Sequence, residues 1–151
     1  MSKNSVIRRA EIRDIGALVD LIGVLFAIET DFTVDVQRQR QGLFLMLEQP
    51  ERCCIMVAEF DGRIVGMCTG QLLVSTAEGG AKVIVEDLVV AEKQRGHGVG
   101  SGLVDAVEKW AKGCGAKRMD LLADQRNHLA LDFYCRREWQ RTELVSLQKR
   151  L

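Results

Sequence analysis

The stretch Gln94-Arg95-Gly96-His97-Gly98-Val99-Gly100-Ser101-Gly102 is the most informative part of this chain of 151 residues. Its glycines alternate with other residues between a hydrophobic segment and an amphipathic one. Because glycine has no Cβ, such a loop can turn its backbone N–H groups toward one point and let a bulky anion approach closely. The helix that we expect next adds its own unpaired N–H groups and the positive end of its dipole. The stretch therefore predicts a phosphate-binding loop.

Hydrophobic periodicity around this loop predicts one α/β (α+β) domain over residues 1–151. Apolar positions recur at helical spacing in segments 15–26 and 103–111, and shorter apolar runs surround them. The expected order is β-α-α-β-β-β-α-β-α-β. Hairpins combined with one βαβ crossover indicate a mixed, largely antiparallel central sheet of six to seven strands, with helices on both faces. The expected strands are 6–10, 54–60, 63–74, 82–90, 118–123 and 139–147.

Short polar signals set the expected ends of these elements. Asp14 and Asn127 each precede an apolar periodic segment, where a helix-capping side chain is expected. Asp61-Gly62 separates two apolar runs and predicts a two-residue hairpin turn in which glycine takes a positive φ. The second helix must stop before Pro50, the only proline.

Composition excludes several classes of partner. The 21 Lys and Arg residues balance the 21 Asp and Glu residues, so there is no electrostatic case for a nucleic-acid partner. No run of about 18 apolar residues could span a membrane, and we see no signal-peptide pattern. The five cysteines form no Cys-x-x-Cys pair, and we interpret them as reduced packing residues of a cytoplasmic protein. Neither histidine has the partners of a metal site, so no metal is expected.

Three kinds of phosphate-binding loop compete for the glycine-rich stretch. A P-loop requires a Lys after its glycines, and none follows here. A dinucleotide-binding loop requires Gly-x-Gly-x-x-Gly directly after a strand, whereas residues 91–95 intervene here. A plain flexible linker would need neither Gln-Arg at its start nor a helix at its end.

The third kind of phosphate-binding loop is that of the GNAT acetyltransferase superfamily. Segment 94–100 resembles its Gln/Arg-x-x-Gly-x-Gly/Ala motif. Segment 85–90, Val-Glu-Asp-Leu-Val-Val, resembles the strand before that motif. Asn127, Ala130, Phe133 and Tyr134 resemble the later Asn-x-x-Ala-x-x-Phe-Tyr helix. The expected element order also matches along essentially the whole chain. The resemblance implies that the loop binds the pyrophosphate of acetyl-coenzyme A between splayed strands.

The chain departs from the family pattern after this helix. Glu138 stands where members usually have a helix-ending glycine, and Trp139 replaces a phenylalanine. A residue other than glycine in a left-handed cap costs about 1 kcal/mol. The departure concerns the path into the last strand and leaves the expected cofactor site unaffected.

Glu86 is the first candidate for a general base, because it interrupts an apolar strand just before the loop. An alkyl ammonium has a pKa near about 10, so an amine must lose a proton before it attacks a thioester. Strand alternation sends Glu86 and Asp87 to opposite faces, and only one should line the reaction centre unless a bulge intervenes. The alternatives are Glu86, Asp87 or a water chain.

The resemblance also implies roles for other residues. The main chain of Leu88, Val89 and Val90 would bind the pantetheine arm and polarise the thioester carbonyl. The loop residues that would bind the cofactor are Gln94, Arg95, Gly96, His97, Gly98, Val99, Gly100 and Ser101. Asn127 would bind the cofactor as well as cap its helix, and Tyr134, the only tyrosine, would protonate the departing thiolate.

The expected reaction is direct attack of a primary amine, from a small molecule or a peptide, on acetyl-coenzyme A. Glu29, Phe32 and Asp87 are the expected acceptor contacts, and the resemblance implies a homodimer. The alternative is a non-catalytic acyl-coenzyme A sensor or interaction module on the same fold. Such a module would need neither Tyr134 nor Glu86.

Overall fold

The computed structural model describes residues 5–29 and 31–151. The chain forms two compact units, residues 1–120 and residues 121–151.

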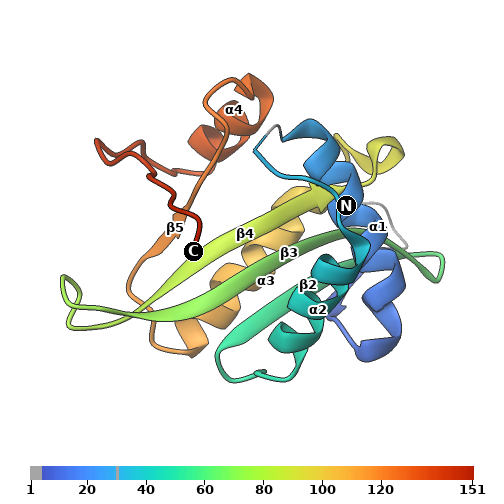
Figure 1. Cartoon of the computed structure of the whole chain (residues 1–151), viewed down its shortest axis with the longest axis horizontal. Helices are drawn as coiled ribbons and strands as arrows, with labels where there is room; N and C mark the ends of the chain where they lie inside the picture. Colours follow the sequence, from blue (N-terminus) through green and yellow to red (C-terminus); the bar gives the residue numbers. More distant parts are fainter. Residues whose placement is uncertain (1–4, 30) are drawn as a thin grey trace. The chain divides into compact units, whose positions relative to one another are not determined.

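The first unit is built around a sheet (Figure 1). Its elements, in chain order, are β1 (Ser5–Arg9), the short 3-10 helix η1 (Ile12–Asp14), α1 (Ile15–Ile28), α2 (Val36–Leu47), β2 (Cys53–Phe60), β3 (Arg63–Ser75), β4 (Gly80–Val90), η2 (Glu92–Gln94), α3 (Val99–Gly113) and β5 (Met119–Leu121), whose last residue begins the second unit. This order agrees with the predicted one up to β5.

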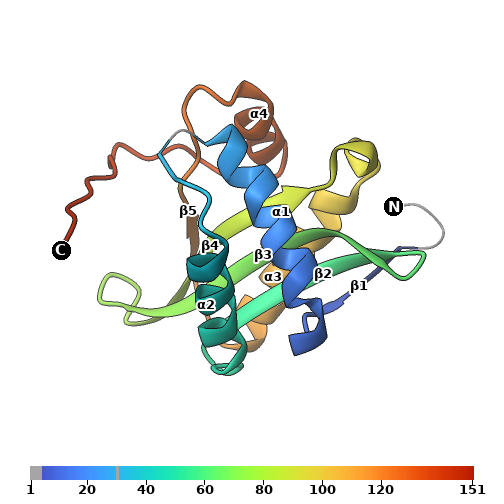
Figure 2. The same ribbon diagram turned by 45° about the vertical axis from the view of Figure 1, so that its right-hand side comes forward.

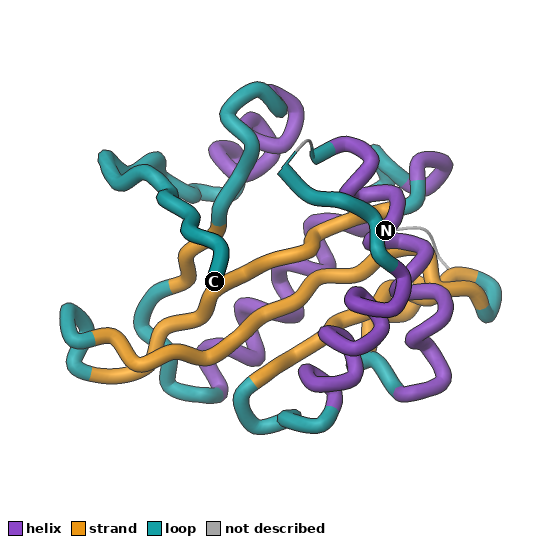
Figure 3. The backbone as a smooth tube through the Cα atoms, in the orientation of Figure 1, coloured by secondary structure: helices purple, strands orange, loops and turns teal. Residues whose placement is uncertain are grey.

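The sheet has the order β1-β2-β3-β4-β5. The first three pairings are antiparallel, and the long β3–β4 hairpin is the largest of them (Figure 3). β5 runs parallel to β4, because Lys117 N donates to Ala81 O and, further along both segments, Val83 N donates to Arg118 O. The sheet is therefore mixed and largely antiparallel, as predicted, but it has five strands instead of six to seven.

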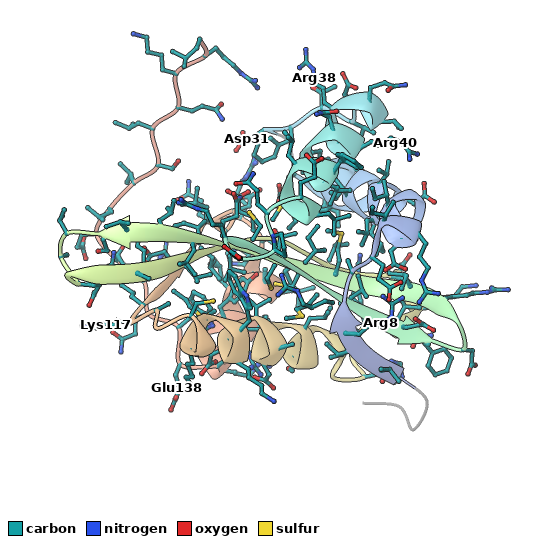
Figure 4. The ribbon with its side chains drawn as sticks, turned by 90° about the horizontal axis from the view of Figure 1, so that it is seen from below. Arg8, Asp31, Arg38, Arg40, Lys117 and Glu138 are labelled. Atoms are coloured by element: carbon teal, nitrogen blue, oxygen red, sulfur yellow. The ribbon has the colours of Figure 1, made fainter. Side chains whose placement is uncertain are left out.

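Helices cover both faces of the sheet. α1 and α2 lie over one face and α3 over the other (Figures 2 and 4). The core on the first face joins α1 and α2 to inward side chains of the central strands, including Val57, Met67 and Val89. On the other face, α3 buries the positions that its periodicity predicts, namely Leu103, Val104, Val107 and Ala111.

Two glycines bring β3 into close contact with α3. A Cβ on Gly66 would lie 3.0 Å from Leu103 Cδ1, and one on Gly70 would lie 2.9 Å from Val107 Cγ1. Residues 66 and 70 share one face of the strand, and Leu103 and Val107 share one face of the helix. The missing side chains thus allow the helix that follows the loop to pack closely on the sheet.

The hairpin prediction is confirmed. Asp61 and Gly62 have φ of 48° and 74°, and Phe60 pairs with Arg63, so the turn has two residues with positive φ at both. This is the type I′ geometry that Asp-Gly favours.

The prediction that Asp14 caps α1 is wrong. Asp14 closes η1 in a helical conformation and makes no capping bond to α1. Its carboxylate instead accepts hydrogen bonds from Glu11 N at 2.8 Å and from Arg8 Nη1 and Nη2 at 2.8 and 3.0 Å. Arg8, labelled in Figure 4, also donates to Glu59 and so ties β1 to β2 and to the start of α1.

In the second unit, α4 (His128–Arg136) begins at Asn127, whose side chain accepts from Ala130 N at 3.1 Å. This capping role is confirmed. Glu138 has φ 65°. Glu138 N donates to Cys135 O, and Trp139 N donates to Tyr134 O, both at 3.1 Å. This is the Schellman pattern that usually takes glycine at residue 138, and the Tyr134 and Trp139 rings, 5.8 Å apart, supply its apolar contact.

The expected last strand at 139–147 is wrong. Residues 139–151 form no strand or helix, and Leu144, Val145 and Leu147 are 80% or more exposed. The β-prone composition of this segment marks it as suited to a sheet, but a strand exists only where neighbouring main chain pairs with it.

Candidate functional site

The glycine-rich loop leads from η2 into the first turn of α3. Gly96 and Gly98 have φ of 76° and 82°, a conformation that other residues adopt at a cost. Gly98 is the residue before the helix, and Val99 is its first residue. The two glycines therefore bend the chain so that the loop and the helix N-terminus are continuous.

The backbone N–H groups of this turn are open. Within the part of the chain that the structure describes, the first main-chain bond after Arg95 N is made by Gly102 N, which donates to Gly98 O at 3.0 Å. The amides of residues 96–101 have no protein acceptor among the described residues. Gly96, His97 and Gly98 are exposed, while Gly100 and Ser101 are half-buried. Open amides at a helix N-terminus are suited to binding an anion.

Arg95 is held at the front of the loop. Its Nε donates to Val90 O at 2.9 Å, which fixes the guanidinium next to the end of β4. The side chain is exposed and adds a positive charge beside the open amides. Gln94, the last residue of η2, is half-buried.

The strand before the loop contains a β-bulge. Met67 pairs with Val89, but Thr69 pairs with Glu86, so β4 has one residue more than β3 between these pairs. Asp87 lies at this irregularity and has φ 42°. Residues other than glycine rarely adopt a positive φ outside turns and helix caps, and bulges that hold such a residue within a strand are enriched next to active sites.

The bulge places both carboxylates on one face. Directly paired residues share a face, so Glu86 lies on the face of Thr69, and the Thr69 hydroxyl donates to Asp87 Oδ2 at 3.3 Å. Met67, two residues from Thr69, belongs to the α1–α2 core, which identifies this face. The sequence predicted that Glu86 and Asp87 lie on opposite faces unless a bulge intervenes. The structure has the bulge, and the two carboxylates share one face.

The two carboxylates differ in environment. Glu86 is exposed, whereas Asp87 is half-buried. Burial, and then the charge of Glu86, raises the pKa of Asp87 to about 6, although the Thr69 hydrogen bond acts in the opposite direction. The pKa of Asp87 therefore lies well above that of an ordinary aspartate.

Beyond the bulge, Leu88 and Val90 are half-buried and Val89 is buried in the core. Their strand pairs with β3 as far as Gly66–Val90. On the other edge, Val83 bonds to Arg118, so the three residues of β5 reach along β4 to about Glu86. The main chain of Leu88–Val90 therefore continues past the paired part of that edge.

Two of the three predicted acceptor contacts, Glu29 and Phe32, lie just after α1, whereas the third, Asp87, lies at the bulge of β4. Glu29 is half-buried, and its N–H closes the helix on Leu25 O. Phe32 is 45% exposed and stacks on Phe26 with ring centroids 5.1 Å apart. A cavity of about 460 Å³ runs along α1 and reaches the start of the loop. Its lining includes Asp20, Leu21, Val24, Ile28, Glu92 and Arg95.

In the second unit, Tyr134 is half-buried in α4. Its ring also makes an edge contact with Phe133 at a centroid distance of 5.2 Å. Asn127 lies about two turns before Tyr134, at the helix N-terminus.

Sequence reasoning missed Thr69. It is fully buried, and it is the only described side chain recorded as a hydrogen-bond partner of Asp87. A signal was available, because the turn between β3 and β4, which begins after Ser75 and ends before Gly80, could have been used to align Thr69 with Glu86. The extra residue in β4 could not be placed in this way.

Residues 5–29 and 31–151 contain no group of three or more His, Cys, Asp or Glu side chains arranged to hold a metal ion. In the same residues, no helix is both long enough and apolar enough to cross a bilayer.

Solved structures with the same fold include three that are named as acetyltransferases. A predicted acetyltransferase from Clostridium acetobutylicum, solved with acetyl-CoA, has a TM-score of 0.81 and 19% identity over 95% of this chain and 96% of its own. An aminoglycoside acetyltransferase from an uncultured soil metagenomic sample has a TM-score of 0.80 and 21% identity, over 99% of this chain and 98% of its own. Glucosamine-6-phosphate N-acetyltransferase from Arabidopsis thaliana has a TM-score of 0.78 and 19% identity, over 97% of this chain and 99% of its own.

No curated protein sequence matches the chain. The model of the acetyltransferase (GNAT) family matches residues 22–138, which include the bulged strand, the glycine-rich loop and α4. The chain belongs to the GNAT acetyltransferase family.

Proposed function

We propose that this protein is an N-acetyltransferase that moves the acetyl group of acetyl-CoA to a primary amine by direct attack in a ternary complex. The observation that carries the proposal is the set of open amides at residues 96–101, which follow, after the short helix η2, a bulged strand that presents two carboxylates. The family supplies the cofactor class, and one structural relative was solved with acetyl-CoA.

The cofactor's pyrophosphate would be bound by the N–H groups of segment 96–101, with Arg95 adding charge and Gln94 supporting the turn. The main chain of Leu88, Val89 and Val90 would pair with the pantetheine arm, and Asn127 would add a polar contact. A backbone N–H in Leu88–Val90 would also stabilise the developing oxyanion, which is worth about 3 kcal/mol of barrier.

Glu86 would take the proton of the attacking ammonium, directly or through water, and Tyr134 would return a proton to the departing thiolate. A phenol pKa of about 10 and a thiol pKa of about 8.5 make this second transfer nearly balanced. Because Glu86 is exposed, its carboxylate is accessible to an incoming amine. Each proton transfer is worth about 10²-fold or more in rate.

The acceptor would be a small-molecule or peptide amine. Two relatives are named for amine substrates, an aminoglycoside and glucosamine-6-phosphate. Acidic groups suit a cationic acceptor, and Glu29 and Asp87 are two of them on the unit that carries α1. Phe32 would supply an apolar contact.

Thiol release from acetyl-CoA, measured with a panel of amines, tests the proposal. Glu86→Gln should lower kcat/KM by about 10²-fold near neutral pH, with a smaller loss as pH rises. Tyr134→Phe should lower the rate and alter the alkaline limb of its pH profile. Cofactor binding without turnover on any amine would instead support an acyl-CoA sensor.

The loop has a matched control. Gly96 and Gly115 both have φ 76°, and a Cβ on either would meet nothing within 4 Å. Ala at either position therefore introduces a similar backbone cost of about 1 kcal/mol. Gly96→Ala should weaken coenzyme A binding in calorimetry by about tenfold, and Gly115→Ala should leave it unchanged. Equal effects of the two variants would refute anion binding by the loop.

A further inference from the structure

Thr69 is a buried polar residue whose hydroxyl binds a carboxylate. The side chain is 0% exposed in the middle of β3, beside Met67 and Cys68, which are also fully buried. Its Oγ1 donates to Asp87 Oδ2 at 3.3 Å. A valine would fill the same space without burying an oxygen, so the hydroxyl is explained by the carboxylate that it binds.

Asp87 in turn is held in an unfavourable backbone conformation. With φ 42° at the bulge, its carboxylate is on the face of Glu86 instead of the opposite one. A regular strand would place Asp87 toward α3, where the facing side chains are apolar. The bulge and Thr69 together thus present a second carboxylate on the side of α1.

We propose that Asp87 is a second proton-accepting carboxylate on this face, and that Thr69 is the positioning residue that holds it. The proposal rests on the proposed acetyl transfer and deepens it.

The step is a proton transfer. The N–H bond of the substrate ammonium breaks, its electron pair remains on nitrogen as the attacking lone pair, and an O–H bond forms on Asp87 Oδ1. That oxygen is chosen because Oδ2 already accepts from Thr69. An ordinary aspartate lies about six pKa units below an alkyl ammonium. The pKa of about 6 at Asp87 reduces this gap to about four, which makes it a better acceptor.

Few other charges act on Asp87. On β4 the neighbour is Glu86, and on β3 the titratable neighbour is the Cys68 thiol, whose own pKa is raised by burial. The buried face of α3 is apolar, and Asp120 of β5 is paired with Lys82 at 3.0 Å. On α1, the buried face is apolar, and Asp20 lines the cavity together with Glu92 and Arg95.

Thr69→Val and Thr69→Ser separate the hydroxyl from the volume of the side chain. Val removes the donor from the charged carboxylate, so the pKa of Asp87, followed by carbon NMR of its carboxyl group, should rise by about 0.5 to 1 unit. The acid limb of kcat/KM should move to higher pH by the same amount. Ser should restore both values, and Asp87→Asn should abolish that limb.

The outcomes distinguish this inference from the function on which it rests. An Asp87 titration that Thr69→Val does not move overturns the role of Thr69. A wild-type pH profile in an active Asp87→Asn variant overturns the role of Asp87 while acetyl transfer stands. If the wild type acetylates no amine, the catalytic role of Asp87 fails with the proposed function, and the NMR titration alone decides whether Thr69 positions the carboxylate.

Discussion

Replacing Asp87 by Asn should stabilise the protein at neutral pH and not at acidic pH. The folded state raises the pKa of Asp87 from the ordinary 3.8 to about 6, mainly through burial. Between these values the folded protein holds a proton that the unfolded chain has lost. The free energy of unfolding therefore falls as pH rises through this window, and below about pH 4 Asp87 makes no such difference.

The shift sets the size of the effect. About two pKa units correspond to about 3 kcal/mol, and water around a partly exposed carboxylate reduces this to about 1 to 2 kcal/mol. Asn is neutral at every pH, tolerates a positive φ and keeps an oxygen that can accept from Thr69. The backbone of the bulge should therefore be retained.

Urea unfolding of the wild type and Asp87→Asn at pH 4, 5, 6, 7 and 8 measures this difference. Asp61→Asn is the matched control, since Asp61 also has a positive φ but is exposed in the hairpin turn. Its effect should be small at each pH. A difference for Asp87→Asn that stays constant from pH 4 to 8 would refute burial of the charge as its cause.

Three further substitutions test the packing and the caps. Gly70→Ala should destabilise the protein by about 1 to 3 kcal/mol in urea unfolding, because its Cβ would meet Val107 Cγ1 at 2.9 Å. Gly80→Ala is the control and should cost far less, because a Cβ at that position meets nothing within 4 Å. Glu138→Gly should raise stability by about 0.5 to 1 kcal/mol by relieving the left-handed cap, whereas Glu143→Gly in the irregular segment should not. Arg8→Met should cost about 2 to 3 kcal/mol above pH 5, because it leaves the buried Asp14 carboxylate without its cation. Since Arg8 lowers the pKa of Asp14, this cost should shrink as pH falls below about 4, and a cost that is equal at pH 3 and pH 7 would contradict it.

Local patterns predicted most of the fold. The Asp61-Gly62 turn, the cap at Asn127 and the buried positions of α3 depend on neighbouring residues, so the sequence displays them directly. The strand at 139–147 was predicted wrongly, because composition cannot supply a pairing partner. The cap at Asp14 was predicted wrongly, because the Asp14 carboxylate binds the Arg8 guanidinium, which comes from another element and which the local pattern does not show.

For the candidate site, the sequence predicted which segments take part but not how two neighbouring strands align. The family motif predicted the loop, and the structure shows positive φ at Gly96 and Gly98 and a helix that begins at Val99; binding of the cofactor there stays a prediction. The arrangement of Glu86 and Asp87 was left open, because a bulge depends on how two strands align and not on either strand alone. Thr69 was missed for the same reason.

The extra residue in β4 also indicates what a change in the length of the gene would do. Glu86 pairs with Thr69 and Val89 pairs with Met67, so losing the codon for residue 87 would restore regular pleating while Val89 kept its partner and its place against the helices. The core therefore does not require the extra residue. What the shorter chain would lose is the carboxylate that the Thr69 hydroxyl binds.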